Sequence, residues 1–158
     1  MTFLLASGFL LVKIPFFTTF INPMTTAESL APASKEQPSY ILIVEDDVLQ
    51  RSSLAEWLRL QNHVVYESSS TDAAALLLSS PLLHIDLVIT DIWLPGIMSG
   101  SNFVEYIRYR FPTMPVIIIS GVFNKAPLDA HTAFFQKPYN LDDISLQITK
   151  MIESIKEE

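Results

Sequence analysis

The fold is decided by a stretch that reads YILIVEDD at residues 40–47. Five consecutive apolar residues, several of them β-branched, predict a short strand buried on both faces, as in a parallel sheet. The run ends in three acids. Helical spacing then relates four positions, Arg51, Leu54, Ala55 and Leu58. Asp47 is expected to cap this helix at its N-terminus. The stretch therefore predicts a buried strand that leads directly into a helix.

The same alternation continues toward the C-terminus. We expect further strands at residues 63–66, 85–90, 115–120 and 132–135, and further helices at 70–80, at 102–111 and after a capping Asn140. Strands that alternate with helices predict parallel βαβ units. Five strands of this kind favour the flavodoxin-like order 2-1-3-4-5. The expected fold class is thus α/β, a three-layer sandwich with a five-stranded parallel sheet between two helical layers.

Composition excludes several classes of protein. The chain has no cysteine, which rules out disulfide scaffolds, thiolate metal sites and cysteine nucleophiles. Its net charge is −7 and it has no cluster of Lys or Arg, so direct binding to nucleic acid is not expected. It has only 4 glycines and no Gly-rich nucleotide-binding loop.

Residues 1–23 differ from the rest, because Lys13 is their only charged residue. The apolar stretch 3–21 approaches the ~20 residues that span a bilayer, but Lys13 lies at its centre and Pro15 interrupts it. Three explanations stay open: a start codon placed too far upstream, a membrane anchor or a targeting segment. We expect residues 24–38 to be a flexible polar linker and residues 39–158 to form the folded domain.

Acids end two strands that the expected order makes neighbours. Glu45 and Asp46 follow the first strand and Asp91 ends the third, while Ser120 and Lys137 follow strands four and five at the same edge. Two carboxylates about 4 Å apart repel by roughly 4 kcal/mol at an effective dielectric near 20. The cluster therefore needs a cation, or some of its acids must be protonated, and Mg²⁺ is the natural cation. A hydroxyl and an ammonium nearby suit a phosphoryl group, and an aspartate can itself accept one.

Four motifs now carry a family resemblance. They are ILIVEDD at 41–47, LVITDIWLPG at 87–96, VIIISG at 116–121 and FFQKPY at 134–139. In this order and on these elements, they make residues 39–157 resemble the receiver domain of two-component response regulators. The resemblance implies a stand-alone, bacterial phosphoacceptor protein that signals through contacts with other proteins.

The resemblance also assigns roles to residues at the matching positions. It implies that Asp91 is phosphorylated, and that Mg²⁺ is held by Glu45 through water, by Asp46, by Asp91 and by the Trp93 backbone carbonyl. Lys137 and Ser120 would contact the phosphate, and Ser120 and Phe134 would form a switch. The resemblance also implies a cis-type peptide bond before Pro138. The protein would then be no enzyme beyond its own aspartyl phosphorylation and dephosphorylation.

Partners and location follow from the same resemblance. It implies phosphorylation by a sensor histidine kinase or a histidine phosphotransfer protein, an unknown downstream protein, and a cytoplasmic location. If residues 3–21 are a genuine anchor, the receiver would be tethered to the inner membrane on its cytoplasmic side.

The chain departs from the family's pattern after Ser120. Residues 121–127 form helices poorly, so we expect the fourth helix to be shortened or missing. Phe134 lacks the hydroxyl of a tyrosine switch. A pseudo-receiver that acts without phosphorylation therefore stays open, as does a small-molecule phosphatase with an aspartyl nucleophile, for which the chain has little room. Arg108 and Arg110 are expected at a solvated helix end.

Overall fold

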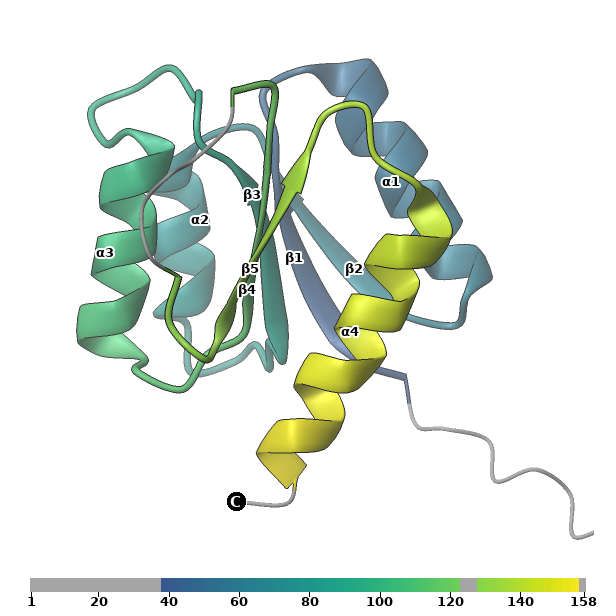
Figure 1. The fold of residues 1–158 in the computed structure, drawn as a ribbon. Helices are drawn as coiled ribbons and strands as arrows, with labels where there is room; N and C mark the ends of the chain where they lie inside the picture. The colour runs from purple at the N-terminus through teal and green to yellow at the C-terminus, as the bar shows by residue number, and fades with distance from the viewer. Residues whose placement is uncertain (1–37, 123–127, 157–158) are drawn as a thin grey trace, which may run out of the picture. The chain divides into compact units, whose positions relative to one another are not determined.

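The computed structural model describes residues 38–122 and 128–156. In this part of the chain, the elements are β1 (Tyr40–Val44), α1 (Val48–Leu60), β2 (Val64–Ser68), α2 (Thr71–Leu78), β3 (Leu87–Asp91), α3 (Gly100–Arg110), β4 (Val116–Ser120), β5 (Thr132–Gln136) and α4 (Leu141–Lys156). All strand pairs are parallel and the order is β2-β1-β3-β4-β5, which confirms the predicted topology (Figure 1).

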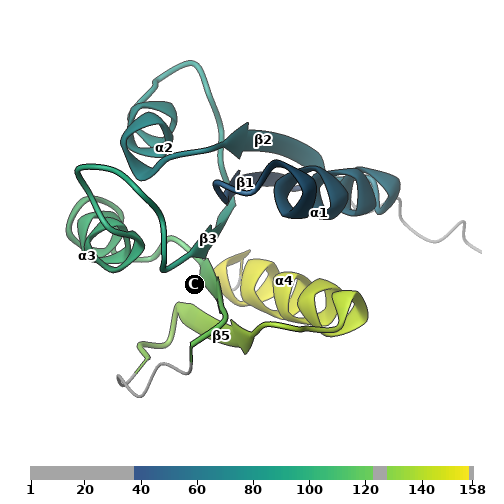
Figure 2. The ribbon, with the colours of Figure 1, turned by 90° about the horizontal axis from the view of Figure 1, so that it is seen from above.

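The sheet lies between two helical layers. Helices α1 and α4 cover one face, and α2 and α3 cover the other (Figure 2). Successive side chains of a strand point to opposite faces. In β1, Ile41 and Ile43 therefore pack toward α1 and α4, whereas Leu42 and Val44 pack toward α2 and α3. Burial on both sides explains why the strand is apolar without interruption.

Polar side chains start the helices where the strands end. Asp47 caps α1 by accepting a hydrogen bond from the backbone N–H of Gln50 at 2.9 Å, as predicted. Asn140 accepts one from the N–H of Asp142 at 2.9 Å, also as predicted. Helix α3 begins two residues before the predicted position 102, because Ser99 serves as its N-cap. Each cap gives a hydrogen-bond partner to a backbone N–H in the first turn of its helix, which has none within the helix.

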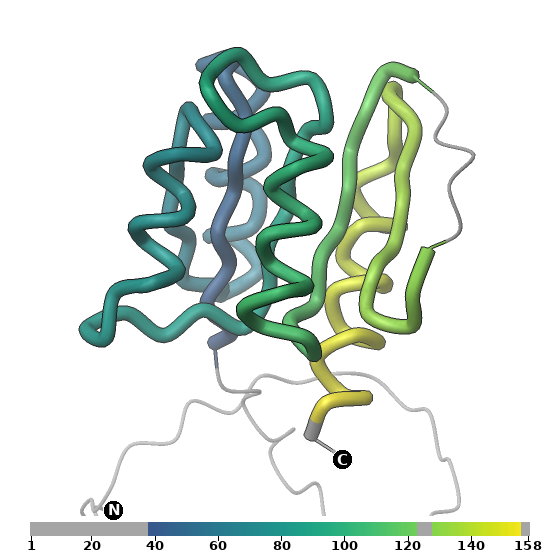
Figure 3. The backbone as a smooth tube through the Cα atoms, turned by 90° about the vertical axis from the view of Figure 1, so that its left-hand side faces the viewer, coloured from purple at the N-terminus to yellow at the C-terminus, as the bar shows by residue number. Residues whose placement is uncertain are grey.

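The connection between β4 and β5 has no helix in its described residues, which are 121, 122 and 128–131. Figure 3 shows α2 and α3 in front of the sheet, with no described helix in front of β4 and β5. This agrees with the expected shortening, although residues 123–127 lie outside the described part.

Arg108 corrects one sequence-based expectation. Its side chain is only 19% exposed, so it does not lie in solvent at the end of α3. Its guanidinium donates to Asp129 Oδ2 (2.5 Å), to the Met114 carbonyl (2.6 Å) and to Thr132 Oγ1 (2.7 Å). The end of α3 is thereby tied to the start of β5. Arg110 is exposed, as expected.

Residues 1–37 lie outside the described residues, and so do the apolar stretch 3–21 and all but the last residue of the 24–38 linker. Within the described residues, no helix is both long and apolar enough to cross a bilayer.

Gly100 allows α3 to start against the end of β3. A Cβ at this position would lie 2.2 Å from the Asp91 carbonyl oxygen and 2.6 Å from Ile92 Cα. Both are backbone atoms, so Gly100→Ala must displace the loop that follows Asp91. We expect the free energy of unfolding to fall by roughly 1–3 kcal/mol, measured by urea denaturation. Gly121→Ala is the matched control, because a Cβ there meets nothing within 4 Å, and equal losses in the two variants would contradict the account.

Candidate functional site

Lys137 joins two acids from distant parts of the chain. Its Nζ donates a hydrogen bond to Glu45 Oε2 at 2.7 Å and another to Asp91 Oδ2 at 2.6 Å. Glu45 and Asp91 are each only 8% exposed, although both are acids. A buried carboxylate is costly unless it is paired, so one ammonium supports two such groups here.

The sheet topology brings these three residues together. Strands β1 and β3 are neighbours with Val44 opposite Thr90, so Glu45 follows β1 where Asp91 ends β3. Lys137 follows β5, and its backbone N–H donates to the Ser120 carbonyl at 2.8 Å. The Lys137–Pro138 peptide bond is cis, as the resemblance implied.

Burial and pairing act in opposite directions on the charges of the site. Burial raises the pKa of Glu45 above its usual 4.5, and the hydrogen bond and charge of Lys137 only partly offset this. Burial also opposes the charged form of Lys137, but its bonds to Asp91 and Glu45 outweigh this and raise its pKa above 10.5. With Glu45 ionised, the two acids and one ammonium leave an unbalanced negative charge at the carboxyl edge.

The other residues of the predicted metal set are arranged differently. The Trp93 N–H donates to Asp91 Oδ1 at 2.9 Å, so the two carboxylate oxygens of Asp91 have separate partners, while the Trp93 side chain is 68% exposed. Asp46 is exposed beside Glu45. No group of three or more His, Cys, Asp or Glu side chains in the described ranges is placed to hold a metal ion. The structure thus gathers two of the three expected carboxylates.

The predicted switch residues lie on the two strands beyond β3. Ser120 is fully buried at the end of β4, and its Oγ accepts a hydrogen bond from the Val122 N–H at 3.3 Å. Phe134 is partly buried on β5 and packs with the core cluster on the α2 and α3 side. Both positions are compatible with the predicted switch, whose operation stays a prediction.

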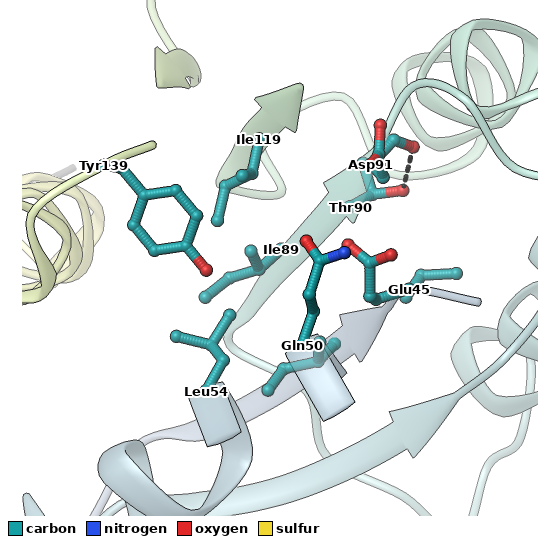
Figure 4. Close-up of a pocket in the computed structure, with 10 residues that line it drawn as sticks. Glu45, Gln50, Leu54, Ile89, Thr90, Asp91, Ile119 and Tyr139 are labelled. Carbon is teal, nitrogen blue, oxygen red and sulfur yellow. Dashed lines mark hydrogen bonds between the residues drawn. The ribbon is translucent and has the colours of Figure 1, made fainter. Parts of the chain in front are cut away.

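A small pocket opens beside Glu45 and Asp91, and sequence reasoning missed two of its polar residues. Figure 4 shows the Gln50 amide near the Glu45 carboxylate and the Tyr139 hydroxyl pointing into the same pocket. Burial raises the pKa of Tyr139, and the charge of Lys137 partly opposes that shift. A signal for Gln50 existed, since it lies one turn into α1 from the acidic residues.

Comparison with known proteins now decides the family. A family model for the response regulator receiver domain matches residues 41–149. The chain belongs to this family of receiver domains. The match confirms the resemblance drawn from the four motifs.

This receiver domain is similar to parts of two longer curated proteins. It is 32% identical over 124 residues to an NtrX-like response regulator of Rickettsia conorii, and 26% identical over 118 residues to the sensor kinase CckA of Brucella abortus. The alignments cover 73% and 72% of this chain, but 25% and 12% of the two relatives. The chain therefore spans about a quarter of the first relative and less of the second.

Solved receiver domains share the fold over almost their whole length. The receiver domain of the hybrid histidine kinase CckA has a TM-score of 0.62 and 28% identity, and covers 72% of this chain and 99% of that one. The receiver domain of NtrX from Brucella abortus has a TM-score of 0.61 and 27% identity, with 72% and 98% covered. A CheY-like receiver domain from Methanospirillum hungatei JF-1 has a TM-score of 0.69 at 23% identity, with 76% and 98% covered, and shows the fold alone.

The raised pKa of Glu45 gives a prediction for stability. When the pKa of a group is higher in the folded than in the unfolded state, the free energy of unfolding of the protein falls as the pH rises through the folded pKa. The ionised carboxylate of Glu45 therefore costs stability at neutral pH, and Glu45→Gln should raise the midpoint of thermal unfolding by a few degrees at pH 7. The gain should shrink as the pH falls toward 4.5, the usual pKa of the group, where wild-type Glu45 is also protonated.

Unfolding followed by circular dichroism across this pH range measures the effect. Glu56→Gln is the control, because Glu56 lies exposed on the same helix and its replacement should change stability by no more than about 0.5 kcal/mol. A Glu45→Gln variant that is less stable than wild type at pH 7 would show that pairing with Lys137 outweighs burial.

Proposed function

We propose that this receiver domain accepts a phosphoryl group on Asp91 from a phosphohistidine, in a reaction that depends on Mg²⁺. The observation that carries the proposal is the ammonium of Lys137 held between the buried carboxylates of Asp91 and Glu45. Such a centre offers a nucleophilic oxygen and a cation for the charge that phosphoryl transfer moves. The names of two matches, a sensor kinase and a hybrid histidine kinase, support a histidine kinase as the donor.

The donor atoms of the site fit Mg²⁺. They are oxygens, and the charge of the acids exceeds that of the single ammonium. Mg²⁺ is usually held by one or two carboxylates, keeps several waters and shares phosphate oxygens, so it needs no cage of three gathered acids. Glu45 (through water), Asp46, Asp91 and the Trp93 carbonyl would hold it. When bound, it would neutralise charge on the phosphoryl oxygens.

Different residues of the chain would have different roles in the phosphoryl transfer. One carboxylate oxygen of Asp91 attacks the phosphorus in line, the bond from phosphorus to the donor's imidazole nitrogen breaks, and its electron pair stays on the imidazole. The Trp93 N–H on Oδ1 and Lys137 on Oδ2 orient the carboxylate for this attack. In the product, Lys137 and Ser120 would bind the new phosphoryl oxygens.

The conformational change caused by phosphorylation would be transmitted through β4 and β5. A phosphoryl group on Asp91 would draw the Ser120 hydroxyl toward it, away from the Val122 N–H that it now accepts from. Phe134, on the neighbouring strand, would repack in response. We place this signalling in the cytoplasm and infer that a protein of unknown identity reads the altered surface.

A small phosphodonor tests the proposal without knowledge of the kinase. Incubation with acetyl phosphate and Mg²⁺ should add the mass of one phosphoryl group, and peptide mapping should place it on Asp91. Asp91→Asn and chelation of Mg²⁺ with EDTA should each abolish the addition. Asp143→Asn, an exposed acid in the first turn of α4, should leave it unchanged.

The alternative of a pseudo-receiver is favoured by one observation: the described residues between β4 and β5, which are 121, 122 and 128–131, contain no helix. It predicts that the wild-type protein stays unmodified by acetyl phosphate. It also predicts that Asp91→Asn binds the downstream protein with unchanged affinity. Phosphorylation of Asp91 accompanied by altered affinity would exclude it.

A further inference from the structure

Arg51 is a cation placed behind the acidic residues, and the site described above does not use it. It lies on the first turn of α1, and its side chain is only 15% exposed. Its NH1 group donates to the backbone carbonyl of Glu45 at 2.7 Å and to that of Asp46 at 3.3 Å. One guanidinium thus contacts the main chain of both adjacent acids.

Contacts with β2 hold Arg51 in this position. Arg51 Nε lies 3.5 Å from Glu67 Oε2, and Glu67 also pairs with Arg59 at 2.8 Å. The Glu45 N–H donates to the Ser68 carbonyl at 3.1 Å, which extends the pairing of β1 with β2 by one residue. The turn that carries Glu45 and Asp46 is therefore fixed by β2 on one side and by Arg51 on the other.

We propose that Arg51 is a positioning residue for Mg²⁺, because it fixes the backbone from which Glu45 and Asp46 present their carboxylates. The inference rests on the proposed function, since it concerns the same metal site. Hydrogen bonds from a charged donor are among the stronger ones in proteins, and two of them restrict the turn. Residues that orient metal ligands in this way typically change metal affinity by roughly 10- to 100-fold when they are replaced.

The charge of Arg51 predicts the opposite effect from its positioning role. A cation beside a metal site repels Mg²⁺, so loss of the charge alone would strengthen binding. Loss of the two carbonyl contacts would instead free the turn and weaken binding. The sign of the change in affinity therefore separates the two roles.

The experiment is a Mg²⁺ titration of the full chain without any phosphodonor. The exposed Trp93 side chain next to Asp91 reports binding by fluorescence, in a Trp57→Phe background that removes the other tryptophan. Arg51→Met should raise the Mg²⁺ dissociation constant about 10-fold or more. Arg59→Met is the matched control, because Arg59 also pairs with Glu67 but donates to the Val65 carbonyl instead of the acidic turn, and its dissociation constant should stay near that of wild type.

An unchanged or tighter affinity in Arg51→Met would overturn the inference while leaving the proposed function intact. Arg51→Lys covers the case in which Arg51→Met fails to fold: it keeps the charge but lacks the planar group that reaches both carbonyls. Binding weaker than wild type in this variant supports positioning, and unchanged binding overturns it. A wild-type protein that does not bind Mg²⁺ would overturn the proposed function together with this inference.

Discussion

The structure of the site depends on one ammonium shared by two buried carboxylates. Lys137 contacts Glu45 and Asp91 at 2.7 and 2.6 Å, and it brings together residues that are 92 and 46 positions away in the chain. Without a counterion, two acids that are each 8% exposed would repel one another. An internal cation thus holds the two acids together. Under the proposed function, Mg²⁺ would share this role and Lys137 would bind the phosphoryl oxygens.

The buried carboxylate of Glu45, which the proposed function requires, lowers the stability of the folded domain. Burial raises the pKa of Glu45 despite its contact with Lys137, so the ionised site is a cost that the rest of the domain must offset. The offset comes from the two apolar clusters on the faces of the sheet, which include Ile41, Ile43, Leu42 and Val44 of β1 itself. The same strand that supplies the core thus delivers Glu45 to the site, which links packing directly to chemistry.

Much of this could be predicted from sequence because strong local signals agree with one another. The apolar runs before Glu45, Asp91 and Ser120 marked strand ends, and parallel order placed those ends at one edge. What sequence did not reveal depends on long-range side-chain contacts. The place of Arg108 at a helix end predicts exposure to solvent, yet its guanidinium bonds to Asp129 and Thr132. Helical spacing places Arg51 on the same inward face as Leu54 and Leu58, and an arginine on that face is the signal in the sequence for its buried role.

Under the proposed function, a divalent cation and a phosphoryl group share the centre held by Lys137. A crystal structure of the protein with Mg²⁺ and a beryllofluoride mimic of the phosphoryl group would test this arrangement. We expect the mimic on Asp91, the metal beside it with Glu45 and Asp46, and Lys137 moved from the acids to a fluorine. A structure in which Asp91 stays bare and Lys137 still bridges Glu45 and Asp91, at concentrations of both ligands that load other receiver domains, would contradict it.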